Sequence, residues 1–91
     1  MGILDGRAAI ITGSAQGIGR ATAELFVELG AKVLISDIDG ELAEQTSNEI
    51  DGETAVFAGD LTQPDMPEKL VAAGYEAFGE IDTVVNNAGY S

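Results

Sequence analysis

Short apolar runs alternate with longer amphipathic stretches along the whole chain. The apolar runs are continuous, which is typical of strands buried on both faces. They cover residues 7–12, 32–36, 54–58 and 82–85. Between them, apolar residues recur at helical spacing over residues 18–29, 40–50 and about 62–78. Strands alternating with helices predict an α/β fold, a doubly wound parallel sheet with right-handed crossovers and the strand order 3-2-1-4.

The helix patterns also predict caps and buried faces. Asp39 is expected to cap the second helix, and Thr62 with Asp65 resembles a capping box for the third. Gly74 inside the third helix is expected to cost about 1 kcal/mol relative to alanine. On the first helix, the apolar positions at helical spacing are Ile18, Ala21, Leu25, Phe26 and Leu29; on the third, the expected inward positions are Leu70, Ala73, Ala77 and Phe78.

A glycine-rich turn joins the first strand to the first helix. Gly13 would permit a sharp turn, Gly17 has no Cβ to block a bound pyrophosphate, and Gly19 would let the helix pack close to the strand. Free N–H groups at the start of that helix, together with its dipole, form an anion site. The alternative is a tight strand-to-helix turn that binds nothing.

Polar and glycine residues follow all four predicted strands. In a parallel sheet the carboxyl ends of the strands share one edge, where ligands bind. The residues that follow the strands are Gly13 to Gly19, Asp37, Asp60 with Leu61, and Asn86 to Gly89. The sequence therefore predicts a ligand site at this edge.

The chain of 91 residues is strongly acidic, with 16 Asp and Glu against 4 Lys and Arg and a net charge of −12. This charge argues against nucleic-acid and anionic-membrane partners, and it repels a dinucleotide at long range. A salt-adapted or solubility role for the excess acid is one hypothesis. Cys and His are absent, so no metal site and no thiol chemistry are expected. No apolar run is long enough for a membrane span, and a cytoplasmic protein is expected.

The motif Thr-Gly-Ser-Ala-Gln-Gly-Ile-Gly at residues 12–19, with Asn-Asn-Ala-Gly at residues 86–89, resembles the short-chain dehydrogenase/reductase family. The resemblance covers the whole chain and implies a Rossmann-type domain that binds NAD(P). It implies that the pyrophosphate side is held by Gly13, Ser14, Gln16, Gly17, Ile18 and Gly19. It places Asp60 and Leu61 beside the adenine, and Asn87, Ala88 and Gly89 near the adenosine ribose and the middle of the cofactor. Asn86 is expected to tie neighbouring strands together.

Asp37 is expected to select the cofactor. It follows Gly19 by 18 positions, near the spacing of about 20 at which an acid binds the ribose hydroxyls. A carboxylate there would repel a 2′-phosphate, which carries roughly −2 charge. Relatives that bind NADP often carry Arg or Lys at the positions that hold Gln16 and Ile38 here. NAD(H) is therefore predicted over NADP(H).

Several of these residues also have a purely structural interpretation. Ser14 could satisfy local backbone groups only, and Asp37 could simply cap a strand end. Asp60 follows a glycine and could belong to an ordinary turn. Asn86 and Asn87 could serve only to satisfy backbone groups at the strand end.

The family's chemistry uses a Ser, a Tyr and a Lys four residues after that Tyr, all beyond the fourth strand. Here Gly79 stands four residues after Tyr75, and the sequence ends one residue after Tyr90. No catalytic residue is therefore assigned, and these 91 residues alone are expected to bind a dinucleotide without transferring hydride.

The parent is expected to be an oxidoreductase that interconverts an alcohol and a carbonyl, its small substrate bound by the missing half. The alternatives are an NAD(H)-sensing module without turnover and a methyltransferase. The fourth strand would expose an apolar edge, so a homo-oligomer is also expected.

Overall fold

The structure is a computed structural model that describes residues 2–87. Three strands each lead into a helix, and a fourth strand follows, in the predicted order. The strands are β1 (Ala8–Thr12), β2 (Lys32–Asp37), β3 (Thr54–Ala58) and β4 (Thr83–Val85). The helices are α1 (Gly17–Glu28), α2 (Gly40–Glu49) and α3 (Met66–Phe78).

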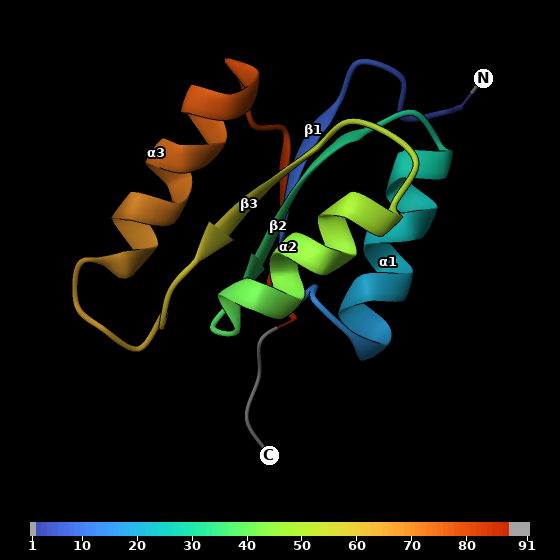
Figure 1. Cartoon of the computed structure of the whole chain (residues 1–91). Helices are drawn as coiled ribbons and strands as arrows, with labels where there is room; N and C mark the ends of the chain where they lie inside the picture. The colour runs from blue at the N-terminus through green and yellow to red at the C-terminus, as the bar shows by residue number, and fades with distance from the viewer. Residues whose placement is uncertain (1, 88–91) are drawn as a thin grey trace.

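The strands of residues 2–87 form one parallel sheet in the order β3-β2-β1-β4, as predicted. Helices α1 and α2 cover one face of it, and α3 covers the other (Figure 1). The carboxyl ends of the strands therefore meet at one edge, where the loop after β1 leads into α1. This arrangement is the predicted doubly wound α/β fold.

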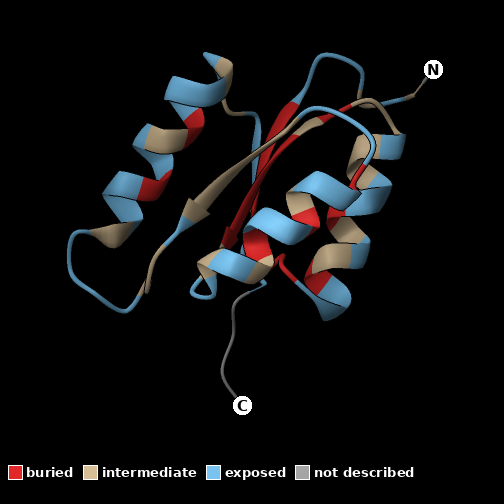
Figure 2. Ribbon diagram, viewed as in Figure 1, coloured by how far each residue is buried: buried red, intermediate tan, exposed pale blue. Residues whose placement is uncertain are grey.

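The two central strands supply most of the core, because each of their faces is covered by a helix (Figure 2). Ile11 and Ile35 pack in the cluster that includes side chains from α1 and α2. Ile10 and Leu34 pack in the cluster that includes Leu70 of α3. Alternate residues of each strand thus enter opposite layers, which explains why the apolar runs are continuous.

The predicted buried face of α1 is wrong in part. Ile18 is 79% and Leu25 50% exposed, and Ala21 is exposed as well. The helix instead turns Gly19 and Ala23 toward the sheet, and Phe26 and Val27 pack partly against the core. Small residues allow helix and sheet to approach closely. They therefore determine which face of α1 turns toward the sheet, although the larger apolar side chains lie on another face.

The predicted capping box of α3 is wrong. Asp65, not Thr62, is the N-cap residue, and its side chain makes no capping hydrogen bond within the described chain. The Thr62 hydroxyl donates to Asp60 instead. Ala77, expected to point inward, is exposed.

Gly74 has a packing role that helix propensity alone does not predict. It is buried in α3, and a Cβ at this position would approach the Cδ1 atoms of Ile81 and Ile10 at 2.7 and 3.0 Å. The glycine therefore lets α3 lie close against the sheet, which offsets its lower helix propensity.

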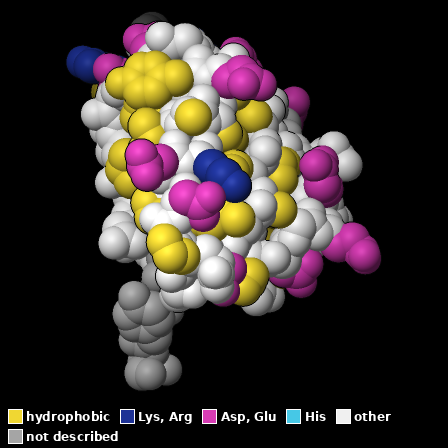
Figure 3. All heavy atoms as spheres, turned by 90° about the vertical axis from the view of Figure 1, so that its left-hand side faces the viewer, with side chains coloured by type: hydrophobic (Ala, Val, Ile, Leu, Met, Phe, Trp, Pro, Cys, Tyr) yellow, Lys and Arg dark blue, Asp and Glu magenta, His cyan; other side chains and the backbone are white. Residues whose placement is uncertain are grey.

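Strand β4 forms an edge of the sheet within residues 2–87, where it pairs only with β1. Val84 at its centre is 54% exposed, and Val71 and Tyr75 of α3 are exposed too. Figure 3 shows apolar side chains scattered among carboxylates on the α3 side of the molecule. An apolar unpaired edge invites pairing with another strand.

We expect the 91-residue chain to self-associate through this edge, and Val84→Lys to shift it toward the monomer in sedimentation velocity. A charged side chain on an edge strand opposes pairing with a second copy. Ile3→Lys is the matched control, because it introduces the same charged side chain at an apolar residue that is 84% exposed and lies outside the sheet. Equal behaviour of both variants would contradict the role of β4.

Candidate functional site

The glycine-rich turn has the backbone geometry that its sequence predicts. Gly13 and Gly17 have φ values of +63° and +64°, a region that residues with a Cβ rarely adopt. A Cβ on Gly19 would overlap the carbonyl oxygen of Gly13 and crowd the side-chain amide of Asn87. A Cβ on Gly17 would have nothing within 4 Å. The turn thus brings α1 against β1 and leaves space over Gly17.

The first turn of α1 supplies backbone donors beside this space. The first N–H groups of a helix have no intrahelical partners, and here they belong to Gly17, Ile18 and Gly19. The N-cap residue Gln16 makes no side-chain capping bond within the described chain, and the first turn carries no acidic residue. These donors and the positive end of the helix dipole suit an anion.

Ser14 is bonded to the backbone of β1 and β2. Its hydroxyl is fully buried, donates to the Ile11 carbonyl at 2.6 Å and accepts from the Ser36 N–H at 3.0 Å. Its own N–H donates to the Ser36 carbonyl. Ser14 thereby extends the pairing of β1 with β2, because its N–H and its hydroxyl both bond to backbone groups of the two strands.

Ala15, the next residue, is held at both of its backbone polar atoms. Its N–H donates to Asp37 Oδ2 at 3.1 Å. Its carbonyl accepts from the Thr46 hydroxyl at 2.5 Å. Both Ala15 and Thr46 are fully buried, so the end of β2 and the middle of α2 together fix the path of the turn.

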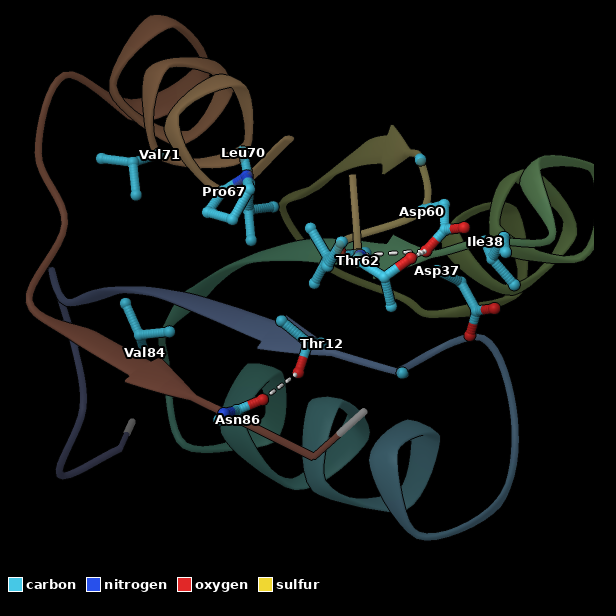
Figure 4. A pocket seen from close by; sticks show the side chains of 14 residues that line it. Thr12, Asp37, Ile38, Asp60, Thr62, Pro67, Leu70, Val71, Val84 and Asn86 are labelled. Atoms are coloured by element: carbon cyan, nitrogen blue, oxygen red, sulfur yellow. Dashed lines mark hydrogen bonds between the residues drawn. The ribbon is translucent and has the colours of Figure 1, made fainter. Parts of the chain in front are cut away.

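A cavity of about 710 Å³ opens at the carboxyl edge of the sheet, between the strand ends and α3. Of the predicted site residues, Gly13, Asp37, Asp60 and Leu61 line it. In Figure 4, Asp37, Ile38 and Asp60 lie together at one end, and the Asp37 carboxylate points toward the loop after β1. The α3 side of the cavity is apolar and is formed by Pro67, Leu70 and Val71.

Asp60 is fixed by the turn that follows β3. Its Oδ1 accepts from the N–H of Thr62 at 2.9 Å and from the hydroxyl of Thr62 at 2.7 Å. These bonds hold the pKa of the Asp60 carboxyl below its ordinary value, because they stabilise the ionised form. Asp60 therefore presents a charged acceptor at the mouth of the cavity.

The two asparagines after β4 bind β1 and the glycine-rich turn. Asn86 Oδ1 accepts from the Thr12 hydroxyl at 3.3 Å, which agrees with its expected role in tying strands together. The Asn87 N–H donates to the Thr12 hydroxyl, and its Nδ2 donates to the Gly13 carbonyl at 3.3 Å. The predicted cofactor contacts of Ala88 and Gly89 lie outside the described residues.

Every basic side chain of the chain is paired with a carboxylate. Arg20 binds Glu24 and Glu49, and the remaining pairs are Arg7 with Asp82, Lys32 with Glu80, and Lys69 with Asp65. None of the described residues that line the cavity is Lys or Arg. An anion at this edge would therefore depend on backbone N–H groups for its binding.

The contribution of α2 to the site was not predicted from the sequence. Thr46 of this helix is buried, and its hydroxyl donates to the Ala15 carbonyl. A polar residue among the inward positions of a helix is the signal that could have found it, because a buried hydroxyl needs a partner.

Within residues 2–87, no helix combines the length and the hydropathy that a membrane crossing requires.

Comparison with known proteins agrees with this geometry. The chain is 47% identical over 85 residues to a sorbitol dehydrogenase of Cereibacter sphaeroides, and 42% identical over 88 residues to a zerumbone synthase of Zingiber zerumbet. These matches cover 93% and 94% of the chain but 33% of each relative. The chain thus spans about a third of the length of these curated relatives.

Solved structures give the same result. A 7α-hydroxysteroid dehydrogenase, solved with NADH and 7-oxo glycochenodeoxycholic acid, superposes with a TM-score of 0.92 at 37% identity over 96% of this chain and 35% of that one. A hydroxysteroid dehydrogenase from Escherichia coli gives 0.91 at 37% identity, over 96% of this chain and 38% of that one. The family model described as short chain dehydrogenase matches residues 7–91. With its Rossmann-type sheet and glycine-rich turn, the chain belongs to the short-chain dehydrogenase family.

Proposed function

We propose that this chain binds NAD(H) and is the cofactor-binding part of an oxidoreductase that interconverts an alcohol and a carbonyl by hydride transfer. The observation that carries the proposal is the position of Asp37. Its carboxylate lines the cavity beside the glycine-rich turn, and no Lys or Arg lines that cavity among the described residues. A nicotinamide dinucleotide, as the family implies, supplies the hydride chemistry when bound.

The residues fit such a ligand. The space over Gly17 and the N–H groups of the first turn of α1 would hold the pyrophosphate. Asp60 and Leu61 border the cavity where the adenine would lie, next to the exposed side chain of Ile38. Contacts of Gln16 and Ile18 with the phosphates, and of Asn87, Ala88 and Gly89 with the ribose side, are part of the same proposal.

Asp37 favours NAD over NADP on electrostatic grounds. A carboxylate accepts hydrogen bonds from the two ribose hydroxyls, whereas a 2′-phosphate would bring roughly −2 charge against it. The following residue, Ile38, has no charge to compensate this repulsion. The structural relative that was solved with NADH supports the same choice.

We expect NADH to bind at least about tenfold more tightly than NADPH, since this corresponds to only about 1.4 kcal/mol of discrimination. Titration of the chain with each nucleotide, followed by calorimetry, measures both dissociation constants. Tighter binding of NADPH would overturn the role of Asp37. Failure of both nucleotides to bind would overturn the proposed site as a whole.

The second candidate is a module that senses NAD(H) without turnover. These 91 residues have no assigned proton donor, because His and Cys are absent and the two lysines, Lys32 and Lys69, pair with Glu80 and Asp65. A Tyr-x-x-x-Lys motif in downstream coding sequence would favour the enzyme, and a stop codon after Ser91 would favour the module. The match to the short-chain dehydrogenase family removes the support for a methyltransferase.

A further inference from the structure

The glycine-rich turn takes its shape from side chains outside it. Ala15 lies at its centre and is fully buried, so water cannot satisfy its backbone groups. Asp37 Oδ2 accepts its N–H, and the Thr46 hydroxyl donates to its carbonyl. A buried backbone group that loses its partner costs as much as a lost hydrogen bond.

We propose that Asp37 and Thr46 are positioning residues for the phosphate-binding turn, which they hold through the N–H and the carbonyl of Ala15. The inference rests on the proposed function and extends it. The acid that would bind the sugar also sets the shape of the turn that would bind the diphosphate.

The carboxylate of Asp37 has the capacity for both tasks. Its Oδ2 binds the Ala15 N–H at 3.1 Å, and its Oδ1 binds the Asp39 N–H at 3.1 Å. An ionised carboxylate has about four acceptor positions, so two backbone bonds leave capacity for a ribose diol. The Asp39 bond also joins Asp37 to the start of α2, because Asp39 caps that helix by accepting from the Leu42 N–H.

One consequence concerns cofactor specificity. A substitution that removes the Asp37 carboxylate to admit a 2′-phosphate also releases the Ala15 N–H from its acceptor. Such a variant binds the diphosphate common to NADH and NADPH less tightly. Its preference between the two cofactors changes, but its affinity for both of them falls.

The test uses 2′,3′-dideoxyadenosine diphosphate, which keeps the adenine and the diphosphate but lacks both ribose hydroxyls. Asp37→Ala and Asp37→Asn both remove the charge, but the asparagine oxygen can still accept from Ala15. We expect Asp37→Ala to bind this nucleotide about fivefold or more weakly than Asp37→Asn. Glu44→Gln is the control, because it removes an exposed carboxylate of α2 that does not line the cavity, and it is expected to bind no more weakly than the unchanged chain.

Thr46 provides an independent test of the same proposal. Thr46→Val keeps the shape but removes the hydroxyl that donates to Ala15, and Thr46→Ser restores it. We expect the valine variant to bind the dideoxy nucleotide more weakly by a similar factor, and the serine variant to recover most of the loss. A folded Thr46→Val variant with unchanged binding would contradict the assignment of Thr46.

Amide hydrogen exchange of the ligand-free chain separates this inference from the proposed function. Exchange at the Ala15 N–H is expected to be at least about tenfold faster in Asp37→Ala than in Asp37→Asn, because only the asparagine retains an acceptor. Equal exchange rates, together with equal binding of the dideoxy nucleotide, would show that Asp37 does not position the turn. If the unchanged chain binds no nucleotide, the proposed function fails, and the exchange rates still decide the inference.

Discussion

Gly19→Ala is expected to lower the free energy of unfolding by about 3 kcal/mol or more, a large fraction of the stability of a small domain. The new Cβ would overlap the Gly13 carbonyl oxygen and press on the Asn87 side-chain amide. The carbonyl belongs to backbone at the end of β1, so relief requires α1 to move away from the sheet. Denaturant unfolding followed by circular dichroism measures the change.

Gly17→Ala is the matched control, two positions earlier in the same turn. The new Cβ meets nothing within 4 Å, and the cost comes from a φ of +64°, about 1–2 kcal/mol for an L-residue. Under the proposed function, this variant stays folded but loses NADH affinity by about tenfold or more, because its methyl group enters the space proposed for the pyrophosphate. Equal stability losses in the two variants would contradict the close approach of α1 to β1.

The order of the strands and helices could be predicted, because local sequence signals and tertiary packing favour the same elements. The continuous apolar run at residues 7–12 is a buried central strand, and Asp39 caps α2 as its position before the helical pattern predicts. The face of α1 could not be predicted from apolar spacing. Its orientation depends on how closely helix and sheet approach, and the small residues Gly19 and Ala23 determine that distance.

The candidate site, too, could be predicted from the sequence only in part. The strand-end rule correctly brought Gly13, Asp37 and Asp60 to one cavity. The sequence left open whether Ser14 serves a ligand or the backbone, and only the fold shows its hydroxyl bonded to Ile11 and to Ser36. Such hydrogen bonds between residues far apart in sequence have no periodic signal, so they have to be found in the folded structure.

The glycine-rich turn is therefore better described as one part of a unit that includes the end of β2 and the middle of α2. Glycine positions predict where the backbone can bend, but side chains on two other elements fix how it bends. This division explains why the glycine motif alone does not identify Asp37 and Thr46 as the residues that shape the turn.

Raising the salt concentration from about 10 mM to about 1 M NaCl is expected to raise the unfolding temperature by roughly 10 °C, as the Debye length falls from about 30 to 3 Å. Two effects oppose each other. Salt weakens the five ion pairs, which are exposed and contribute at most about 1 kcal/mol each. Salt also screens the repulsion among 16 carboxylates on a chain with a net charge of −12 and a radius of gyration of 11.8 Å.

The second effect is expected to dominate, because each basic group is already paired and 11 of the 16 carboxylates lie outside the five ion pairs. A variant in which four exposed carboxylates outside the five ion pairs become amides separates this screening from general effects of salt on hydration. The four changes are Glu28→Gln, Glu44→Gln, Glu53→Gln and Glu76→Gln. Differential scanning calorimetry should find this variant more stable than the unchanged chain at low salt and less responsive to added salt. An unfolding temperature that stays flat or falls with salt, or an equal salt response in both chains, would show that charge repulsion does not limit the stability of the fold.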